Sequence, residues 1–538
     1  MDLNDPQHVL AALVVVITSI GVLAAILKRH LETLKPFKDL PMPDGSHWFH
    51  GHAEKYFNVD FQEGVKHLTT DFANEHGLSG NWLANEPVLC ISNYKDARQI
   101  LMTEYSRREP SLFVHHLRGF CGQRNFLIVN GKEWKAKRDA VTRTFDEDFM
   151  KASQVAMKQV TLTLVESLKT KLSNEGGSIQ TDVQPLMKLI TLDVFAMMAF
   201  GEDLKCCREL VPSKLAQSFD FILAEFARRM AGPLNPANLL YWMPTPLNMR
   251  HKHEKEMLFS FVNDLVEKQR RQKTQDNLML SRLMHAQAHV LGKKSIEEVS
   301  SRVLFDDIML LLFAGYDTTS ITLMYALYLL SINPDIQELC AEETFNKSLE
   351  DPKELVYTKG VVQETLRMYP PGPQTTRTVS RDKTLESGFN VPKNTYVYVS
   401  IWSIHRNEKI FPQPLQFRPD RWVKLVDGTD SATANDSSQA SKKWVERASM
   451  EEPKEEPGCT IAAANHKAFF PFSAGGRSCA GQKFALDEAI IVLATLVKHF
   501  QFKLADPTFK PDIQIRGILQ MPKDGIPLTI EMRKKTNF

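Results

Sequence analysis

The chain has 538 residues, of which 43% are hydrophobic and 24% charged, and its formal net charge is +2. This composition describes a globular protein able to bury a large core. The near-neutral charge argues against a general nucleic-acid binder, in which basic residues dominate, so no nucleic acid is expected among the partners.

The N-terminus carries a candidate membrane anchor. Residues 9–27 form an apolar run interrupted only by two hydroxyl residues and a glycine, and a basic stretch follows at 28–30. At about 1.5 Å per residue, a helix of this length is about 28 Å long and can cross a bilayer. Acidic residues precede the run, so the positive-inside rule places the rest of the chain in the cytoplasm.

A cleaved secretory peptide is the alternative interpretation of this run. The basic residues lie on the wrong side for it, and no small-x-small cleavage site follows. We therefore expect residues 1–30 to be an uncleaved, single-pass signal anchor. Pro36, Pro41 and Pro43 then stiffen a hinge at 31–45, which joins the anchor to one large domain at 46–538.

That domain is expected to be mainly α with small β-sheets, an α+β fold. Long apolar-polar periodicity without internal proline predicts helices. They cover residues 145–172, 186–200, 214–230, 254–271 and 300–331. Short β-like pieces are few and lie at 86–92, 395–401 and 523–532.

One segment, residues 425–467, departs from this pattern. It is polar, low in aromatic residues and rich in Ser, Asp, Glu and Pro. Such a segment buries too little apolar surface to offset the entropy of ordering. We expect a disordered insertion on the surface, tolerated there rather than used for docking.

The seven cysteines argue against a zinc site or a disulfide scaffold, because no C-x-x-C pair occurs. Six are expected to be reduced, buried side chains. Cys479 differs, because it lies among glycines in "FFPFSAGGRSCAGQKFAL", with Arg477 two residues before it. Apolar residues at 486, 490, 493 and 497 predict a helix just after the cysteine, whose N-terminus would favour a thiolate.

Several chemistries use a lone cysteine. A nucleophile would need a histidine base, and a phosphate loop would need G-x-G-x-x-G or G-K-S/T, which are missing here. A thiolate shielded by Phe472, in a loop where Gly475 and Gly481 allow close approach, also suits a metal in a planar cofactor. The local residues leave the nucleophile and the metal ligand open.

A longer pattern favours the metal ligand. Phe472, Gly475, Arg477, Cys479 and Gly481 form F-x-x-G-x-R-x-C-x-G, which resembles the haem-binding loop of the cytochrome P450 superfamily. The resemblance implies a P450 fold, with Cys479 as the axial ligand of the iron of haem b and the other four residues around the cofactor.

The apolar stretch 309–330 is interrupted by Asp317 and two threonines. As a second membrane span it would place Asp317 near the bilayer centre, at a cost of about 2.5–3.5 kcal/mol, so a core helix explains it better. The stretch 314–319, A-G-Y-D-T-T, resembles the oxygen-activation motif of the family. The resemblance implies that Ala314 and Gly315 make room for O2, while Asp317 and Thr318 organise proton delivery.

Glu364 and Arg367 lie at i, i+3 of a helix that is expected to end before Pro370. Alone, such a pair is usually a surface ion pair worth well under about 1 kcal/mol. It resembles the E-x-x-R motif of the family, completed by Arg421 in "FRPDRW". The resemblance implies a structural network behind the haem.

The two propionates of a buried haem need basic partners. Trp134 and Arg138 are one helical turn apart and resemble the W-x-x-x-R motif of the family. By the same resemblance Arg377, after "PPGPQTT", and Arg477 complete the set of propionate-binding residues.

The resemblance implies a monooxygenase that inserts one oxygen atom of O2 into a lipophilic substrate such as a sterol, fatty acid, terpenoid or xenobiotic. Electrons would come from NADPH through NADPH-cytochrome P450 reductase, with cytochrome b5 as a further donor, at the endoplasmic reticulum membrane. We expect Lys135, Lys137 and Lys483 to form part of the basic docking face. Residues 113–128, 313, 374–376 and 517–520 are expected to line the substrate site.

Two alternatives stay open. The first is an isomerase or lyase of the same fold that acts on a lipid hydroperoxide or endoperoxide without O2 or reductase. The second is a non-catalytic haem or lipid-binding membrane protein. The acid and alcohol of Asp317 and Thr318 argue against both, because neither function needs a proton relay.

Overall fold

Long helices make up most of the computed structural model. It describes residues 17–18, 20–21, 37–44, 52, 61–83, 86–107, 117–230, 243–272, 278–293, 295–347, 349, 351–427, 442–446 and 467–534. The major helices are α6 Gly131–Thr144, α7 Glu147–Asn174, α8 Val183–Phe200, α10 Lys214–Met230, α12 Pro246–Gln272, α13 Met279–Val290, α14 Ser301–Ser331, α15 Pro334–Asn346, α16 Val356–Met368 and α18 Gln482–His499. All five helices predicted from periodicity are present.

The helix ends follow from their caps. The Asp146 carboxylate accepts from Phe149 N at 2.9 Å and starts α7, and the Asp182 carboxylate accepts from Gln184 N at 3.0 Å and starts α8. Gly201, with φ 69°, ends α8 in the left-handed conformation that favours glycine. The one large boundary error is α12, which begins earlier than predicted, at Pro246, because its first turns are polar and lack the apolar period.

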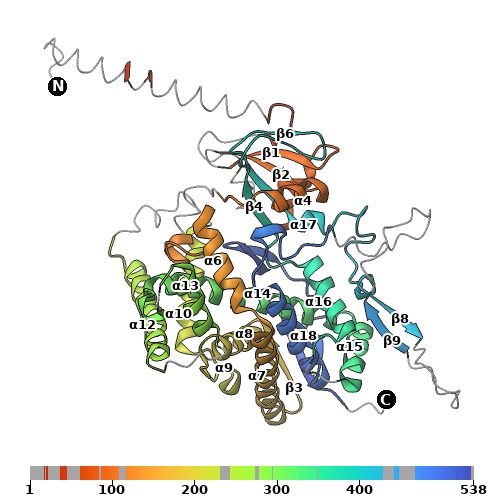
Figure 1. The fold of residues 1–538 in the computed structure, drawn as a ribbon. Helices are drawn as coiled ribbons and strands as arrows, with labels where there is room; N and C mark the ends of the chain where they lie inside the picture. Colours follow the sequence, from red (N-terminus) through yellow and green to blue (C-terminus); the bar gives the residue numbers. More distant parts are fainter. Residues whose placement is uncertain are drawn as a thin grey trace, which may run out of the picture.

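Helix α14 runs through the centre of the molecule and packs against α8, α16 and α18 (Figure 1). Both α14 and α8 are long and apolar enough to cross a membrane, but 83% of the most apolar window of each is buried inside the protein. They are therefore core helices, as expected for 309–330. The predicted anchor at 9–27 lies largely outside the described residues, although Ile17, Thr18, Ile20 and Gly21 are helical and exposed.

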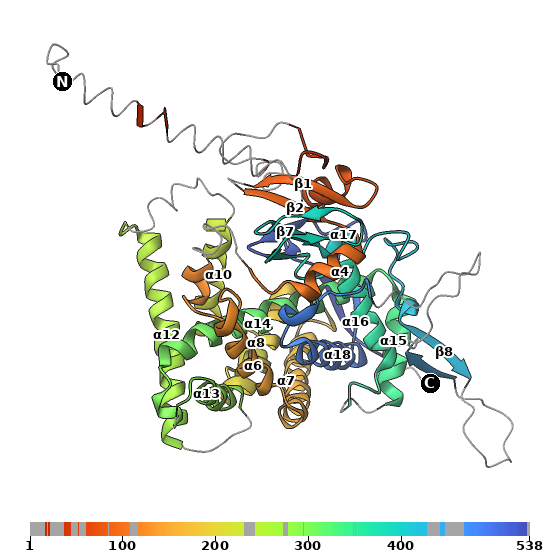
Figure 2. The ribbon, with the colours of Figure 1, turned by 45° about the horizontal axis from the view of Figure 1, so that its top comes forward.

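The sheets are small and lie around the helices. The largest has the strand order β1-β2-β7-β4, in which only β2 and β7 are parallel. Figure 2 shows this sheet with α4, Tyr94–Thr103, beside it. Its strands are β1 Leu78–Leu83, β2 Glu86–Ile91, β4 Gln374–Thr378 and β7 Tyr396–Ser400.

A second sheet has the order β10-β13-β3 and joins the C-terminal strands to a strand before α8. These strands are β10 Phe500–Leu504, β13 Pro527–Met532 and β3 Ser178–Asp182. Two smaller pairs are β11 Ile513–Arg516 with β12 Leu519–Pro522, and β5 Lys383–Thr384 with β6 Asn390–Val391. The three predicted strand pieces coincide with β2, β7 and β13, so the mainly α fold with small sheets is confirmed.

The insertion at 425–467 is not a loop throughout. Strands β8 Val423–Asp427 and β9 Lys442–Glu446 pair as an antiparallel hairpin, which projects beside α15 and α16 (Figure 1). Trp444 packs on Tyr357 with ring centroids 4.6 Å apart, and Lys359 Nζ lies 2.6 Å from Glu446 Oε1. The expectation of a loop is wrong for these strands, because one tryptophan supplies an apolar contact that the average composition conceals. Residues 428–441 and 447–466 lie outside the described residues.

Candidate active site

Cys479 lies in a tight loop between a 3-10 turn, Gly475–Arg477, and the start of α18. Cys479 N donates to Phe472 O at 2.9 Å, and this bond closes the loop around the thiol. Gly475 has φ 71°, and a Cβ there would lie 2.1 Å from the carbonyl oxygen of Leu101 in α4. Gly475 therefore lets the loop pack tightly on α4, and at Gly481 the nearest neighbour of an added Cβ would be the Phe145 ring, at 3.6 Å.

The thiol of Cys479 differs from the other described cysteines. Five of the six are buried, whereas Cys479 keeps accessible surface. Surrounding protein still removes enough water that burial raises the pKa of Cys479, against the opposing effects of the Gly481 N–H and the Arg138 charge. Burial thus opposes the thiolate that the N-terminus of α18 is predicted to favour, and the thiolate form of Cys479 stays a prediction.

Arg477 fixes the loop to the segment that precedes α6. Its guanidinium donates to Tyr105 O at 2.9 Å and to Val129 O at 2.7 Å. The guanidinium carbon lies 4.2 Å from the Trp134 ring centroid, and the Trp134 ring stacks on Tyr105 at 5.9 Å. Carbonyl oxygens orient Arg477 without cancelling its charge.

Two further arginines reach the same loop. Arg138 Nη1 donates to Ser478 O at 2.6 Å, and Arg377 Nη2 donates to Ser473 Oγ at 3.3 Å. Burial, followed by the charge of Arg107, lowers the pKa of Arg138, although Cys479 and Asp139 oppose the shift. The structure thus brings the three predicted propionate-binding arginines to the loop that carries Cys479.

These residues fit a haem. A dianionic ligand would offset the crowding of guanidinium charges, and a single thiolate is a known axial ligand of haem iron. Among the described residues no three His, Cys, Asp or Glu side chains are grouped to hold a metal ion. A porphyrin brings its own nitrogen ligands to iron, so a single thiolate from the chain is enough.

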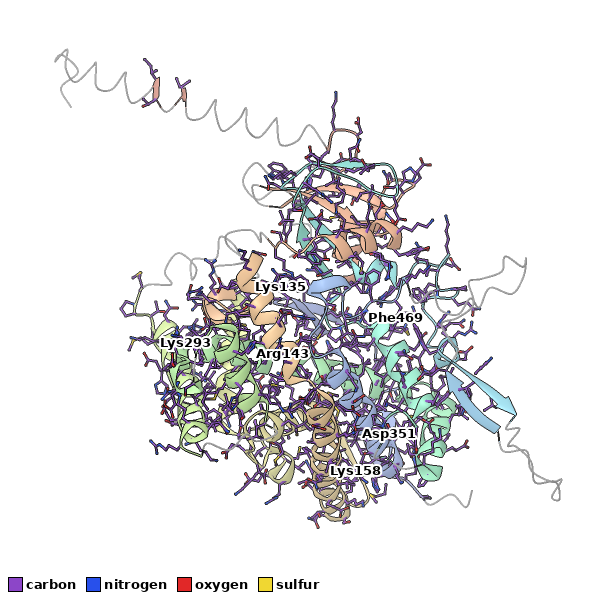
Figure 3. All side chains as sticks on the ribbon, in the orientation of Figure 1. Lys135, Arg143, Lys158, Lys293, Asp351 and Phe469 are labelled. Atoms are coloured by element: carbon purple, nitrogen blue, oxygen red, sulfur yellow. The ribbon has the colours of Figure 1, made fainter. Side chains whose placement is uncertain are left out.

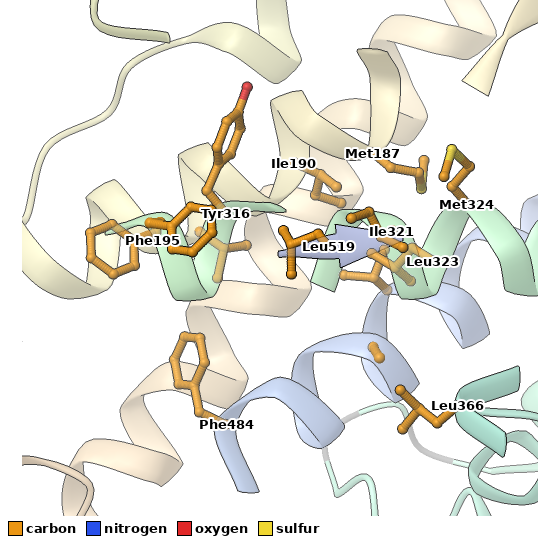
Figure 4. Packing of buried hydrophobic residues seen from close by; sticks show 14 of the residues in the cluster. Met187, Ile190, Phe195, Tyr316, Ile321, Leu323, Met324, Leu366, Phe484 and Leu519 are labelled. Atoms are coloured by element: carbon orange, nitrogen blue, oxygen red, sulfur yellow. The ribbon is translucent and has the colours of Figure 1, made fainter. Parts of the chain in front are cut away.

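Three of the four predicted oxygen-motif residues share one face of α14. Between Leu304 and Leu330, only Ala314, Gly315 and Thr318 are not buried, and they lie at i, i+1 and i+4. A Cβ on Gly315 would lie 3.2 Å from the Phe195 ring, so this glycine also permits the contact between α14 and α8. Figure 4 shows Phe195 beside α14. The Thr318 hydroxyl donates to Ala314 O.

Asp317 points to the buried side of the same helix. It is fully buried, and Lys188 Nζ lies 3.3 Å from its Oδ1. Neither Asp317 oxygen accepts a well-aligned hydrogen bond among the described residues, so its contact with Lys188 is an ion pair. Burial raises the pKa of Asp317, the Lys188 charge opposes this shift, and Asp220 adds to it.

Lys188 was not among the site residues predicted from the sequence. A signal was present, since Lys188 is the one basic residue in the apolar stretch 183–200. An unpaired charge inside such a helix is costly, which implies a buried acidic partner.

The E-x-x-R residues form a buried cluster. Glu364 Oε1 accepts from Arg367 Nη2 at 2.9 Å and from Arg421 Nε at 3.1 Å. Trp422 Nε1 donates to Glu364 Oε2 at 3.0 Å, a partner that the motif did not indicate. Arg367 Nη1 donates to His405 O at 2.9 Å. His405 also accepts from Phe470 N at 3.2 Å, so the cluster reaches the segment that leads to Cys479.

An aromatic cluster joins the segments expected to line a substrate site. The Phe120 ring lies 5.1 Å from Phe313 and 4.9 Å from Phe226. A Cβ on Gly517 would lie 2.8 Å from the Phe226 ring. Phe226, on α10, was missed because its spacing is equally typical of any core-facing helix position.

The predicted docking lysines do not share one environment. Lys135 and Lys483 are exposed, and Figure 3 shows Lys135 and Arg143 along α6. Lys137 is buried, and its Nζ lies 2.7 Å from Asp307 Oδ2. The prediction that Lys137 lies on a docking face is therefore wrong, because helix α6 directs this side chain toward α14.

The comparisons with known proteins agree with this site. A model of the family "Cytochrome P450" matches residues 41–529. The chain is 27% identical over 412 residues to Cytochrome P450 4ae1 of Drosophila melanogaster, covering 74% of this chain and 75% of that protein. It is 23% identical over 533 residues to Cytochrome P450 4X1 of Homo sapiens, covering 95% of both, and 24% identical over 514 residues to human Cytochrome P450 4F8, covering 91% and 90%.

An accessible thiol in a loop held by arginines, together with a buried acid and a partly exposed alcohol on a central helix, is the set of residues expected of a haem-thiolate protein. The chain belongs to the cytochrome P450 family. It is accordingly a haem monooxygenase that uses haem b, O2 and electrons supplied from NAD(P)H through a reductase.

Proposed function

We propose that the protein is a membrane-anchored haem-thiolate monooxygenase that hydroxylates, epoxidises or demethylates a lipophilic molecule with electrons from NADPH-cytochrome P450 reductase. The observation that carries this proposal is Cys479. Its thiol keeps accessible surface in a loop held by Arg138, Arg377 and Arg477.

In this proposal each residue around the thiol has a role in holding haem. Cys479 is the thiolate ligand of the iron, and Arg138, Arg377 and Arg477 pair with the propionates. The Arg477 guanidinium carbon lies 4.2 Å from the Trp134 ring centroid, which supports a role for Trp134 in orienting that guanidinium. Bound haem supplies the activation of O2, which thiolate donation favours.

Asp317 and Thr318 manage protons in this proposal. Thr318 is partly exposed on the face of α14 that also carries Ala314 and Gly315, where its hydroxyl would turn from Ala314 O to donate to an oxygen-containing ligand. Asp317 would resupply that proton through ordered water. Its carboxylate suits this task, because burial raises its pKa toward the working pH.

The substrate class is proposed from apolar surfaces. The cluster of Phe120, Phe226 and Phe313 offers aromatic contacts and no charge, which suits a sterol, fatty acid, terpenoid or xenobiotic. Anchoring through residues 9–27 would place the domain beside the endoplasmic reticulum membrane, where such molecules partition. Lys135 and Lys483 remain the proposed docking residues for the reductase, with cytochrome b5 as a second partner.

Two experiments test this function. A reduced carbon monoxide difference spectrum of the wild type is expected to show a thiolate-type Soret band, which Cys479→Ala removes. Oxygen uptake by the purified enzyme is expected to require both NADPH and reductase. Peroxide conversion without O2 or reductase would support the isomerase or lyase alternative, and haem binding without either activity would support a non-catalytic protein.

A further inference from the structure

Lys188 is a buried cation in an apolar helix. Its helix, α8, carries one other charged side chain within its bounds, Asp193, whose carboxylate accepts from the backbone N–H groups of Cys206 and Cys207 at 3.3 and 2.8 Å. Asp193 is thus used at a local turn. Lys188 instead points to the neighbouring helices α10 and α14.

Two acidic side chains from different helices contact the Lys188 ammonium. Its Nζ lies 2.6 Å from Oδ1 of Asp220 in α10 and 3.3 Å from Oδ1 of Asp317 in α14. The Asp317 carboxylate is fully buried, whereas the Asp220 side chain is 35% exposed. Lys188 therefore joins an acid that is screened from water to one that is partly accessible to it.

Tyr316 completes this arrangement. Its hydroxyl donates to Asp220 Oδ2 at 3.1 Å, and its ring centroid lies 5.1 Å from Lys188 Nζ. Figure 4 shows the Tyr316 side chain extending from α14 with its hydroxyl at the far end. Thr191 Oγ1, one turn after Lys188, donates to Tyr316 O at 2.9 Å. Helix α8 therefore fixes both the side chain of Asp317 and the backbone directly before it.

Stability alone does not explain this pair. The contact between α8 and α14 is otherwise rich in apolar residues such as Ile190, Phe195 and Ile321. A well-packed apolar pair usually stabilises such an interface as well as a buried ion pair does, because both ions lose their hydration. The ion pair between Lys188 and Asp317 is better explained by a role in orienting the Asp317 carboxylate.

The pair also links the acid to the aromatic cluster. Helix α10 carries Asp220 and, on neighbouring turns, Phe219 and Phe226, which pack against Phe120 at 5.9 and 4.9 Å. Phe219 also lies 5.6 Å from the Tyr316 ring. A displacement of α10 by a ligand at Phe120 would therefore reach Lys188 through Asp220.

We infer that Lys188 is a positioning residue, which holds the Asp317 carboxylate in its working orientation and couples it to α10 through Asp220. This inference rests on the proposed monooxygenase function. In this role Lys188 transfers no electrons and contacts no substrate. Its replacement should therefore change the amount of product formed per NADPH consumed.

The main test compares Lys188→Met, Lys188→Arg and wild type as haem-loaded enzymes with reductase. We expect Lys188→Met to lower product formed per NADPH on the order of tenfold, with more hydrogen peroxide released and a changed solvent isotope effect, while Lys188→Arg restores most of the yield. Asp220→Asn is expected to show a smaller loss of the same kind. If the Lys188→Met enzyme formed as much product per NADPH as the wild type and showed the same solvent isotope effect, the inference would be overturned.

Lys137→Met is the matched control. The pairs Lys137–Asp307 and Lys188–Asp317 both end on α14, with side chains 11% and 0% exposed in each. Losing either lysine leaves a buried carboxylate on α14 without its cation, but Lys137→Met is expected to keep the wild-type ratio of product to peroxide. An equal fall in that ratio would show that any buried defect near α14 uncouples the enzyme, and would overturn the inference.

A second readout does not depend on turnover. A double-mutant cycle of Lys188→Met and Asp317→Asn, measured by thermal unfolding, is expected to give a non-additive effect. Additive effects would contradict the pairing itself. Failure of the proposed function is distinguishable, because the wild type would then lack the thiolate-type band or the NADPH-dependent product.

Discussion

Arg477 lies over the Trp134 ring, with its guanidinium carbon 4.2 Å from the ring centroid, two residues before Cys479. The same guanidinium donates to Tyr105 O and Val129 O. A side chain with fixed planar donors suits this set of contacts, and a lysine cannot reproduce it. The arrangement predicts that the geometry of Arg477 matters as well as its charge.

Arg477→Lys is expected to lower haem content and to destabilise the fold by about 1.5–3 kcal/mol, because buried carbonyl oxygens lose charged donors. Absorbance at the Soret band relative to protein, together with denaturant unfolding, measures both effects. Arg143→Lys is the control, because Arg143 is exposed on α6. Full haem content in Arg477→Lys would contradict a role for the fork geometry.

Asp307 predicts a pH dependence of stability. Burial raises the pKa of Asp307 from 3.8 to about 6, against the opposing charge of Lys137. An acid whose pKa is raised on folding stabilises the folded state most below the unfolded pKa, and this contribution is lost as the pH rises through the folded pKa. The difference corresponds to about 3 kcal/mol, lost between about pH 3.8 and pH 6.

The check is the difference in unfolding free energy between wild type and Asp307→Asn across pH 4 to 8. The wild type is expected to lose stability relative to the variant over the acidic part of this range and then to run parallel to it. Gln287 and Lys137 both contact the Asp307 carboxylate in the wild type, and asparagine has nearly the same shape as aspartate, so the comparison isolates the ionisation of residue 307. Parallel curves throughout would show that Asp307 titrates normally.

Glu364 predicts a large structural effect. Glu364→Gln leaves the guanidinium groups of Arg367 and Arg421 buried beside a neutral side chain, so we expect a loss of about 3–5 kcal/mol. The amide keeps one acceptor oxygen in place of two, so either Trp422 Nε1 or the Arg421 guanidinium then faces an NH2 group instead of an acceptor. Low yield of haem-containing protein and a lowered melting temperature are the readouts.

Glu338→Gln is a suitable control for Glu364→Gln. Glu338 accepts from Arg533 at 2.6 Å, but its side chain is 40% exposed, so water compensates the lost charge. A similar melting temperature for the two variants would show that burial of the Glu364 cluster is energetically unimportant.

The sequence predicted those parts of the fold that depend on local pattern. Helix α14 and the strands β2 and β7 follow from periodicity, and the motif around Cys479 indicated a thiol in a loop before α18. The pairing of Lys188 with Asp317 could not be predicted, because 129 positions separate them and only tertiary packing brings α8 to α14. Lys137 was misassigned for the same reason, since a lysine in a polar helix gives no local sign of burial.

The hairpin of β8 and β9 illustrates the opposite error. Average composition predicted disorder at 425–467, whereas pairing is decided by particular residues such as Trp444.

The glycines of the cysteine loop are a further case. Their number suggested clearance for a flat cofactor, but the space at Gly475 is filled by the backbone of Leu101. Sequence shows where backbone freedom is needed, and not which neighbour requires it.

Phe226 predicts a change in ligand preference. Its ring stacks on Phe120 at 4.9 Å and 17° and lies against Gly517, so Phe226→Leu should shorten the aromatic wall without unfolding α10. We expect bulky lipophilic ligands such as sterols to bind several-fold tighter than in wild type, and slim chains to bind more weakly as they lose contact area. Spin-state shifts on titration with each ligand measure this. Phe345→Leu is the control, because that ring is 39% exposed on α15. Unchanged preference in Phe226→Leu would place the substrate site away from this cluster.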